Sequence, residues 1–284
     1  MPRRLRFVAA GLIGVLTAAL HGPVLSAPST VTVAMDQVLW LYAGDAFRCE
    51  LKLPVEDFGT LSFVHEAGHE LQFRVDTIMS PGAAPAVSLE SSPWRQAPAQ
   101  AAMPLKPNAQ GLALDSEATR QLLAALYQRF WFGVHLDRIK LKVPTVHWEA
   151  RADEFQQCQA GLSPLSIAQA RDRTLFYKQG QRALSTEQLQ ELANMARYIA
   201  LDPQVSRVLV DSYTDNTGSY LGNLQLSRER AADVAAALRE FGVPAKLIEH
   251  RAHGERYPSA NNATPEGRDL NRRVTLRIIR KNGK

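Results

Sequence analysis

The sequence is short of cysteine, of long apolar runs and of net charge. Its only cysteines are Cys49 and Cys158, so no lipid attachment is expected near the N-terminal apolar stretch. That stretch, Phe7–Leu20, has 14 residues, and a membrane-spanning helix needs about 20. The formal charge is +5, but residues 1–26 hold three arginines and no acid, so without them it is +2. This weak basicity gives no support for binding to nucleic acid.

The N-terminus has the pattern of a secretory signal peptide. Arg3, Arg4 and Arg6 precede the apolar stretch, and small residues follow at Ser26 and Ala27. An uncleaved membrane anchor is the alternative, which the short apolar stretch disfavours. We therefore expect residues 1–26 to be removed, leaving a periplasmic protein with no membrane span in its mature form.

The two cysteines are separated by most of the first half of the chain. In the oxidising compartment that a signal peptide implies, a disulfide between Cys49 and Cys158 is the natural interpretation. Two buried free thiols are the alternative.

The first half of the chain, residues 27–165, is predicted to be rich in strands. Alternating apolar residues indicate strands around the following positions: Val31 and Val33, residues 38–42, Leu61 and Phe63, and Leu71, Phe73 and Val75. Six prolines between Pro81 and Pro107 predict an irregular surface segment. Within it, Trp94 is a candidate interface anchor, although a solvated loop is an equal alternative.

One helix is predicted in this half. Asp115 or Ser116 can cap its start and Gly133 can end it. Its apolar side is expected to comprise Leu122, Leu123, Leu126, Phe130 and Trp131.

After a linker at residues 160–173, the second half, residues 172–284, alternates strands and helices. Ser185 and Gln188 form a capping box before a helical repeat of apolar residues. A second helix ends at Gly242. The predicted strands are residues 174–177, 205–210, 248–252 and 274–278, with a long loop at 254–270. The order β-α-β-α-β-β predicts a compact α/β sandwich, so the whole chain is of the α+β class.

Unlike charges gather after the second of these strands. Asp215 lies just past the strand end, and Arg230 lies on the helix that follows the loop. An acid and an arginine held close together suit a ligand that carries both an ammonium and a carboxylate. From charge placement alone, an ordinary ion pair is the alternative.

Two segments make the second half resemble a known family. The stretches TDNTGSYLGNLQLSRERAADV and GERYPSANNATPEGRDLNRRV resemble the signature of OmpA-like peptidoglycan-binding domains. The resemblance implies that Asp215 and Arg230 hold the diaminopimelate of the peptide stem, with Asn223 and Arg272 at the border of the pocket. Gly267 and Asn271 are expected to shape a turn. Ser212 and Tyr213 replace the Gly and His frequent in the family.

The first half of the chain resembles a more specific family. The stretches CELKLPVEDFGTLSFVHEAGHELQFRVD, SLESSPWR and DEFQQC resemble the MotY family of flagellar motor proteins. This resemblance implies that Cys49 and Cys158 are disulfide-bonded. It also implies a periplasmic place in the T ring of the basal body, with peptidoglycan, stator units and basal-body ring proteins as partners. No cofactor or catalytic residue is expected. A wall-anchored envelope protein unrelated to motility is the second hypothesis.

One motif points to a different class of protein. His65, Glu66 and His69 match HExxH, which on a helix binds zinc and activates water in metalloproteases. A third ligand would have to come from Glu90, His135 or His147. The alternation on both sides favours two strands and a hairpin instead. The zinc hydrolase is thus a remote alternative, with His65 and His69 as weak metal candidates.

Overall fold

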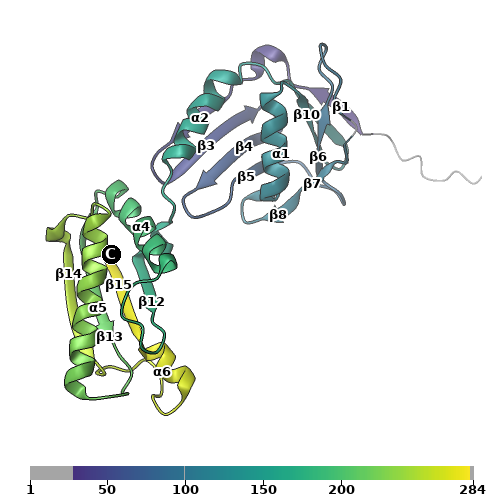
Figure 1. Cartoon of the computed structure of the whole chain (residues 1–284). Coiled ribbons are helices and arrows are strands. Elements are labelled where there is room, and N and C mark those ends of the chain that lie inside the picture. The colour runs from purple at the N-terminus through teal and green to yellow at the C-terminus, as the bar shows by residue number, and fades with distance from the viewer. Residues whose placement is uncertain (1–27, 99, 282–284) are drawn as a thin grey trace, which may run out of the picture.

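The computed structural model describes residues 28–98 and 100–281 (Figure 1). The predicted signal peptide, residues 1–26, lies outside the described residues. Two hydrophobic cores form, one from residues 33–162 and the other from residues 170–278. Among the described residues, no helix is long and apolar enough to cross a membrane.

The first core lies between two sheets. The six-stranded sheet has the order β2-β3-β4-β5-β9-β8, and the five-stranded sheet has the order β1-β11-β10-β6-β7. The strands of the first are β2 (Leu41–Gly44), β3 (Arg48–Val55), β4 (Gly59–Glu66), β5 (Gln72–Thr77), β8 (Lys106–Asn108) and β9 (Gly111–Ala113). Those of the second are β1 (Ser29–Thr32), β6 (Ala86–Glu90), β7 (Met103–Pro104), β10 (Trp131–His135) and β11 (Ile139–Val143).

Aromatic side chains join the two sheets into one core. The ring of Phe73 on β5 lies 5.8 Å from that of Phe132 on β10, and 5.0 Å from that of Phe63 on β4. The hairpin expected here is confirmed, since Phe63 pairs with Phe73 across β4 and β5. Beside the strands lie a 3₁₀ turn (Met35–Gln37) and the helices α1 (Ser116–Tyr127) and α2 (Glu149–Gly161).

Two predictions for this half were wrong. The helix that begins after the Asp115 cap ends at Tyr127, because Arg129 takes a left-handed φ of 64° and the chain turns back. Trp131 and Gly133 lie in β10, where pairing with β6 and β11 outweighs the helical spacing. The proline-rich segment is not wholly irregular either, since β6 and the short strands β7 and β8 begin within it.

The predicted disulfide is present. Cys49 on β3 and Cys158 on α2 are bonded across a sequence separation of 109 residues. It fastens α2, the last helix of the first half, to β3, the second strand of the six-stranded sheet.

The segment between the halves is ordered by a short helix. Helix α3 (Ile167–Arg171) begins with a capping box in which Ser166 and Gln169 exchange hydrogen bonds. Gln169 also donates to the carbonyl oxygen of Gly68 (3.1 Å). The ring of Phe47 lies 5.5 Å from that of Tyr198, so residues of the two halves are in contact here.

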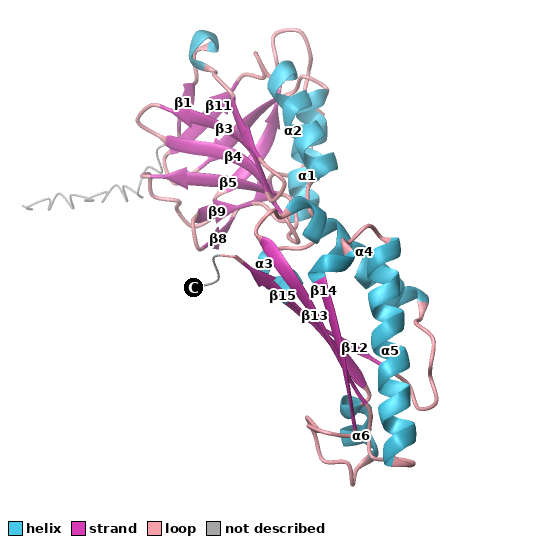
Figure 2. Cartoon of the chain, turned by 90° about the vertical axis from the view of Figure 1, so that its left-hand side faces the viewer, coloured by secondary structure: helices cyan, strands magenta, loops and turns pink. Residues whose placement is uncertain are grey.

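The second half is the expected α/β sandwich. Its sheet has the order β12-β15-β13-β14, with β12 (Asp172–Phe176), β13 (Val205–Tyr213), β14 (Ile248–Gly254) and β15 (Arg273–Arg280). Helices α4 (Thr186–Leu201) and α5 (Tyr220–Glu240) cover one face (Figure 2). The capping box of Ser185 and Gln188 is confirmed, and Gly242 after α5 has a φ of 94°.

The long loop predicted between the last two strands contains a further helix. A 3₁₀ turn (Ala245–Leu247) precedes β14, and α6 (Pro265–Asn271) precedes β15. Thr264 caps α6 and Pro265 occupies its first turn, a combination typical of helix starts. The helix ends at Asn271, and Arg272 connects it directly to β15.

Candidate functional site

Asp215 lies where β13 ends and its loop begins, and it is almost wholly buried. One carboxylate oxygen, Oδ1, accepts the backbone N–H of Thr217 (2.9 Å). The other, Oδ2, accepts a hydrogen bond from Nη1 of Arg272 (2.6 Å). The side chains of Asp215 and Arg272 are only 9% and 10% exposed, so this is a buried ion pair.

These contacts fix the charge of Asp215. Burial favours the neutral acid, but the hydrogen bonds from Arg272 and from the N–H of Thr217 outweigh it and hold the pKa of Asp215 below its usual value. The carboxylate is therefore ionised at neutral pH.

Arg272 joins three parts of the domain. Its Nε donates to the carbonyl oxygen of Tyr177 (3.2 Å), and the N–H of Tyr177 donates to the carbonyl oxygen of Arg272 (2.8 Å). Another of its nitrogens contacts the carboxylate of Asp269 on α6. The end of β12, the loop after β13 and α6 are thus held together at one guanidinium.

Arg230 projects from the middle of α5 into the same region. It is 1% exposed, and its Nη2 donates to the carbonyl oxygen of Gln181 (2.5 Å). Its guanidinium lies 4.3 Å from the centre of the Tyr177 ring, a cation–π contact. Nε and Nη1 have no hydrogen-bond partner among the described residues. A buried guanidinium with two unmet donors is costly unless a further group completes it.

Burial also acts on the protonation of this pair. It lowers the pKa of Arg230 from its ordinary value, although arginine stays protonated in proteins. Burial raises the pKa of Tyr177 to about 12. Arg230 therefore remains a cation beside a neutral phenol.

Asn223, near the start of α5, ties the Asp215 loop to the next one. Its Nδ2 donates to the backbone oxygen of Asp215 (3.3 Å) and to Oε2 of Glu255 after β14 (2.8 Å). Its side chain therefore shapes the loop that carries Asp215.

The structure brings the four predicted residues into one region, with a pairing that the sequence did not indicate. Asp215 contacts Arg272 and Asn223. Arg230 and Arg272 both contact Tyr177, Arg230 through the ring and Arg272 through the carbonyl oxygen. Sequence reasoning missed Tyr177 and Gln181 as members of the site. No motif marks either residue, and only the position of Tyr177 at the end of the first strand of the sandwich hints at its role.

An opening of about 550 Å³ lies beside this cluster. Tyr177 and Arg272 line it together with Lys178, Arg268 and Asp269. Cations outnumber acids here, so the opening suits a ligand with carboxylate groups.

Gly267 and Asn271 have the structural roles expected of them. Oδ1 of Asn271 accepts the N–H groups of Ser259 (2.7 Å) and Ala260 (3.0 Å), which holds the loop before α6. A Cβ on Gly267 would lie 1.9 Å from the carbonyl oxygen of Asn261, so only glycine fits. Both residues position α6 and, through it, Arg272.

The HExxH segment does not form the helix that a zinc protease requires. His65 and Glu66 end β4, and the turn that follows contains His69. Glu66 accepts a hydrogen bond from Arg48 (2.7 Å), and Nδ1 of His65 lies 3.1 Å from Nε2 of Gln159. Across residues 28–98 and 100–281, no three His, Cys, Asp or Glu side chains gather as metal ligands do.

A known protein family matches each half of the chain. The sequence model of the MotY N-terminal domain matches residues 32–164, and that of the OmpA family matches residues 176–272. The chain joins a MotY N-terminal domain to an OmpA domain. The four predicted site residues, Asp215, Asn223, Arg230 and Arg272, all lie within the OmpA match.

The relatives of this chain include a flagellar protein and an outer-membrane lipoprotein. The sodium-type flagellar protein MotY of Vibrio parahaemolyticus is 30% identical over 143 residues, covering 50% of this chain and 49% of that protein. The outer-membrane lipoprotein YfiB of Pseudomonas aeruginosa is 40% identical over 93 residues, covering 33% of this chain and 55% of that protein. The chain thus spans about half the length of these two relatives.

Among solved structures, the peptidoglycan-associated lipoprotein from Burkholderia pseudomallei is 26% identical. The match covers 38% of this chain and 90% of that one, with a TM-score of 0.36.

Proposed function

We propose that this chain is a non-catalytic, periplasmic protein of the flagellar motor that anchors to peptidoglycan through its OmpA domain. The observation that carries the proposal is the buried, incompletely bonded guanidinium of Arg230 in the same cluster as the buried carboxylate of Asp215. We assign residues 27–165 to the MotY-type domain and residues 172–284 to the wall-binding domain.

The ligand proposed is the diaminopimelate of the peptidoglycan stem. Its side chain ends in both an ammonium and a carboxylate. Asp215 would pair with the ammonium, and Arg230 would donate to the carboxylate through Nη2 and one of its two unmet nitrogens, Nε or Nη1. Asn223 and Arg272 would border the ligand, since both contact Asp215.

Access to Arg230 requires a local movement. Its guanidinium is covered by the loop between β12 and α4, whose Gln181 carbonyl accepts one of its hydrogen bonds. A ligand carboxylate would take over that bond while the loop moves aside. An ionised acceptor makes a stronger hydrogen bond than a neutral carbonyl, which favours the exchange.

The MotY-type domain would bind other motor components and help to place stator units. Support comes from the similarity of the chain to the Vibrio flagellar protein. A two-domain tether fits a ring, because weak wall contacts become strong when many copies act together. The disulfide between Cys49 and Cys158 is consistent with export to an oxidising compartment.

Binding to purified sacculi tests the wall-binding part. We expect Asp215→Ala and Arg230→Ala each to lose co-sedimentation with sacculi while keeping the far-ultraviolet circular dichroism of the wild type. Arg239→Ala is the matched control, because Arg239 is an exposed arginine on the same helix. Unchanged co-sedimentation of either site variant would remove the assignment.

A second hypothesis is a wall-anchored envelope protein unrelated to motility. The 40% identity to the lipoprotein YfiB over 93 residues favours it. Deletion of the gene separates the two hypotheses. Loss of swimming in soft agar with filaments still present in electron micrographs supports the motor role, whereas normal swimming supports the generic anchor.

A further inference from the structure

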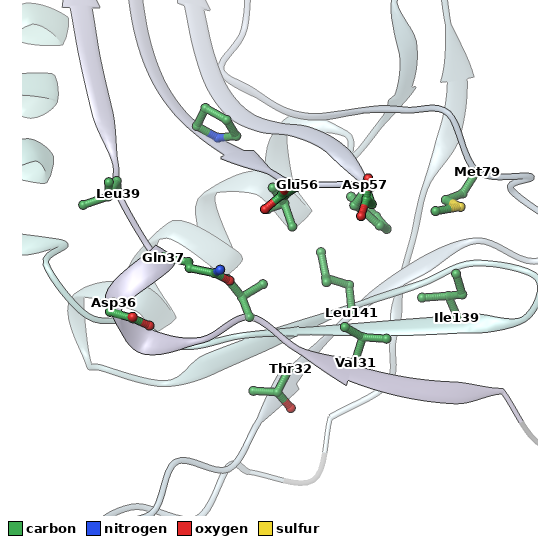
Figure 3. Close-up of a pocket in the computed structure, with 14 residues that line it drawn as sticks. Val31, Thr32, Asp36, Gln37, Leu39, Glu56, Asp57, Met79, Ile139 and Leu141 are labelled. Carbon is green, nitrogen blue, oxygen red and sulfur yellow. The ribbon is translucent and has the colours of Figure 1, made fainter.

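The MotY-type domain has an open groove at one end of its two sheets. The groove has a volume of about 660 Å³ and lies between the edge strand β1 with β11 and the turn from β3 to β4. Figure 3 shows Leu141, Ile139 and Val31 on one side of the opening, facing Glu56 and Asp57. Leu39 and Met79 lie at its two ends in that view.

The wall of the groove formed by β1 and β11 is apolar because of strand alternation. Val31 pairs with Leu141, so both side chains lie on the same face of the sheet. Lys140 and Lys142, which flank Leu141 on β11, lie on the opposite face of the sheet. There Lys140 forms an ion pair with Glu90 (2.9 Å), and Lys142 lies over the ring of Trp131.

Some apolar side chains of the groove remain in contact with water, whereas Leu141 is buried. Val31 is 49% exposed and Leu39 is 60% exposed. Burying such side chains under a partner is favourable in proportion to the apolar surface removed from water. The groove is therefore an extension of the first core that residues 28–98 and 100–281 leave uncovered.

The rim of the groove carries charge of one sign. Asp36, Glu56 and Asp57 line it and are exposed, while no lysine or arginine is among the lining residues. Within the part of the chain that the structure describes, none of the three forms an ion pair. Acids that face an opening without a counter-charge attract a cationic partner and select against an acidic one.

The strand at this edge can receive another extended segment. Among the strands of the described residues, β1 is the outermost of its sheet and pairs with β11 alone. An edge strand of this kind presents unpaired backbone N–H and C=O groups, which an added strand can bond.

We propose that this groove binds an extended segment of a partner protein that carries apolar side chains flanked by lysine or arginine. The apolar side chains would enter between Val31, Leu141 and Leu39. The cations would meet Asp36, Glu56 and Asp57. This inference goes beyond the proposed wall binding, whose residues all lie in the other domain.

Photo-crosslinking in cells locates the partner. A photoreactive amino acid is placed at Leu39 and, as a matched control, at Ile78, which is 83% exposed, apolar and not among the lining residues. We expect a protein adduct from position 39 and none from position 78. The crosslinked peptide should carry apolar residues beside lysine or arginine, and Glu56→Lys should reduce the adduct roughly fivefold or more. Glu240→Lys, an exposed acid on α5, should leave it unchanged.

Several outcomes would overturn the proposal. An adduct with a second copy of the chain would identify the groove as a self-association surface, and an adduct with phospholipid would identify it as a membrane contact. Equal adducts at both positions, no adduct, or a crosslinked peptide without basic residues would each refute it as well.

A binding assay with the purified mature chain tests the chemistry separately. The probe is a short fluorescein-labelled peptide of alternating leucine and lysine, compared with one of alternating leucine and glutamate. We expect the lysine peptide to bind at least about tenfold more tightly and to weaken as salt is added. Leu39→Ser should weaken the binding of the lysine peptide by removing an apolar contact, and Glu56→Lys should abolish the preference, whereas Ile78→Ser should do neither. Equal binding of both peptides by the wild type, or binding unaffected by Leu39→Ser and Glu56→Lys, would refute the proposal. Sacculus binding of these variants stays normal if they are folded, which separates this result from a failure of the wall-binding proposal.

Discussion

Removing the disulfide should destabilise the MotY-type domain and leave the OmpA domain nearly unchanged. The bond joins Cys49 to Cys158 across 109 residues, and both cysteines belong to the first half of the chain. Closing a loop of this length in the unfolded chain lowers its entropy by an amount worth about 4–5 kcal/mol at 25 °C. The double variant Cys49→Ala, Cys158→Ala should lose that much of its free energy of unfolding.

Tryptophan fluorescence reports this domain selectively. All four tryptophans of the chain, Trp40, Trp94, Trp131 and Trp148, lie in the first half. Urea unfolding followed by tryptophan emission should therefore show the whole loss, while the transition of the OmpA domain, followed by tyrosine emission and circular dichroism, should scarcely move. In a thermal scan, the loss corresponds to a decrease in Tm of roughly 15–20 °C for the first transition.

Wild-type protein reduced with dithiothreitol is the control, because it loses the bond and keeps both sulfur atoms. It should unfold like the double variant. A loss of stability below about 1 kcal/mol, or an equal loss in both domains, would refute the loop-entropy account.

Three further predictions concern the OmpA domain and are checked by urea unfolding followed by circular dichroism. Arg272→Met should cost about 3–5 kcal/mol, because it leaves the buried carboxylate of Asp215 without its cation. The pKa of Asp215 is lowered in the folded state, so its contribution to stability is complete above the unfolded value of about 3.9 and is lost as the pH falls through the folded pKa. Asp215→Asn should flatten that acid dependence, and an unchanged dependence would contradict the assignment. Ser185→Ala should cost about 1 kcal/mol through the lost capping box of α4, and a cost near zero would contradict that role.

Local signals in the sequence were sufficient for most of the second half. The capping box of Ser185 and Gln188 and the glycine at 242 mark helix ends by chemistry that acts within a few residues. Such signals do not depend on distant packing, so they survive in the folded protein. The missed helix α6 carries a signal of the same kind in Thr264 and Pro265, which the length of the surrounding loop obscured.

The failures in the first half have a common physical cause. Phe130 and Trp131 continue the apolar spacing of α1, but the backbone reverses at Arg129, and β10 pairs with β6 and β11. Strand pairing outweighs local periodicity, and the pairing with β6, which is distant in sequence, cannot be recognised in a single sequence.

In the candidate site, the positions of the residues were predictable from the sequence, but their contact partners were not. Motif resemblance placed Asp215, Asn223, Arg230 and Arg272 in one region, and the structure brings them together there. The partners were not predictable, because Asp215 meets an arginine 57 positions away and Arg230 meets the backbone of Gln181, 49 positions away. These contacts depend on how the ends of β12, β13 and β15 converge.

The most direct test of the central claim is calorimetric titration of the mature chain with stem peptides. A peptide with diaminopimelate is compared with one in which lysine replaces it, which keeps the ammonium and removes the carboxylate proposed to bind Arg230. We expect the lysine peptide to bind at least about tenfold more weakly, and Arg230→Ala to bind both peptides equally poorly. Equal binding of the two peptides by the wild type, or full binding by Arg230→Ala, would contradict the account.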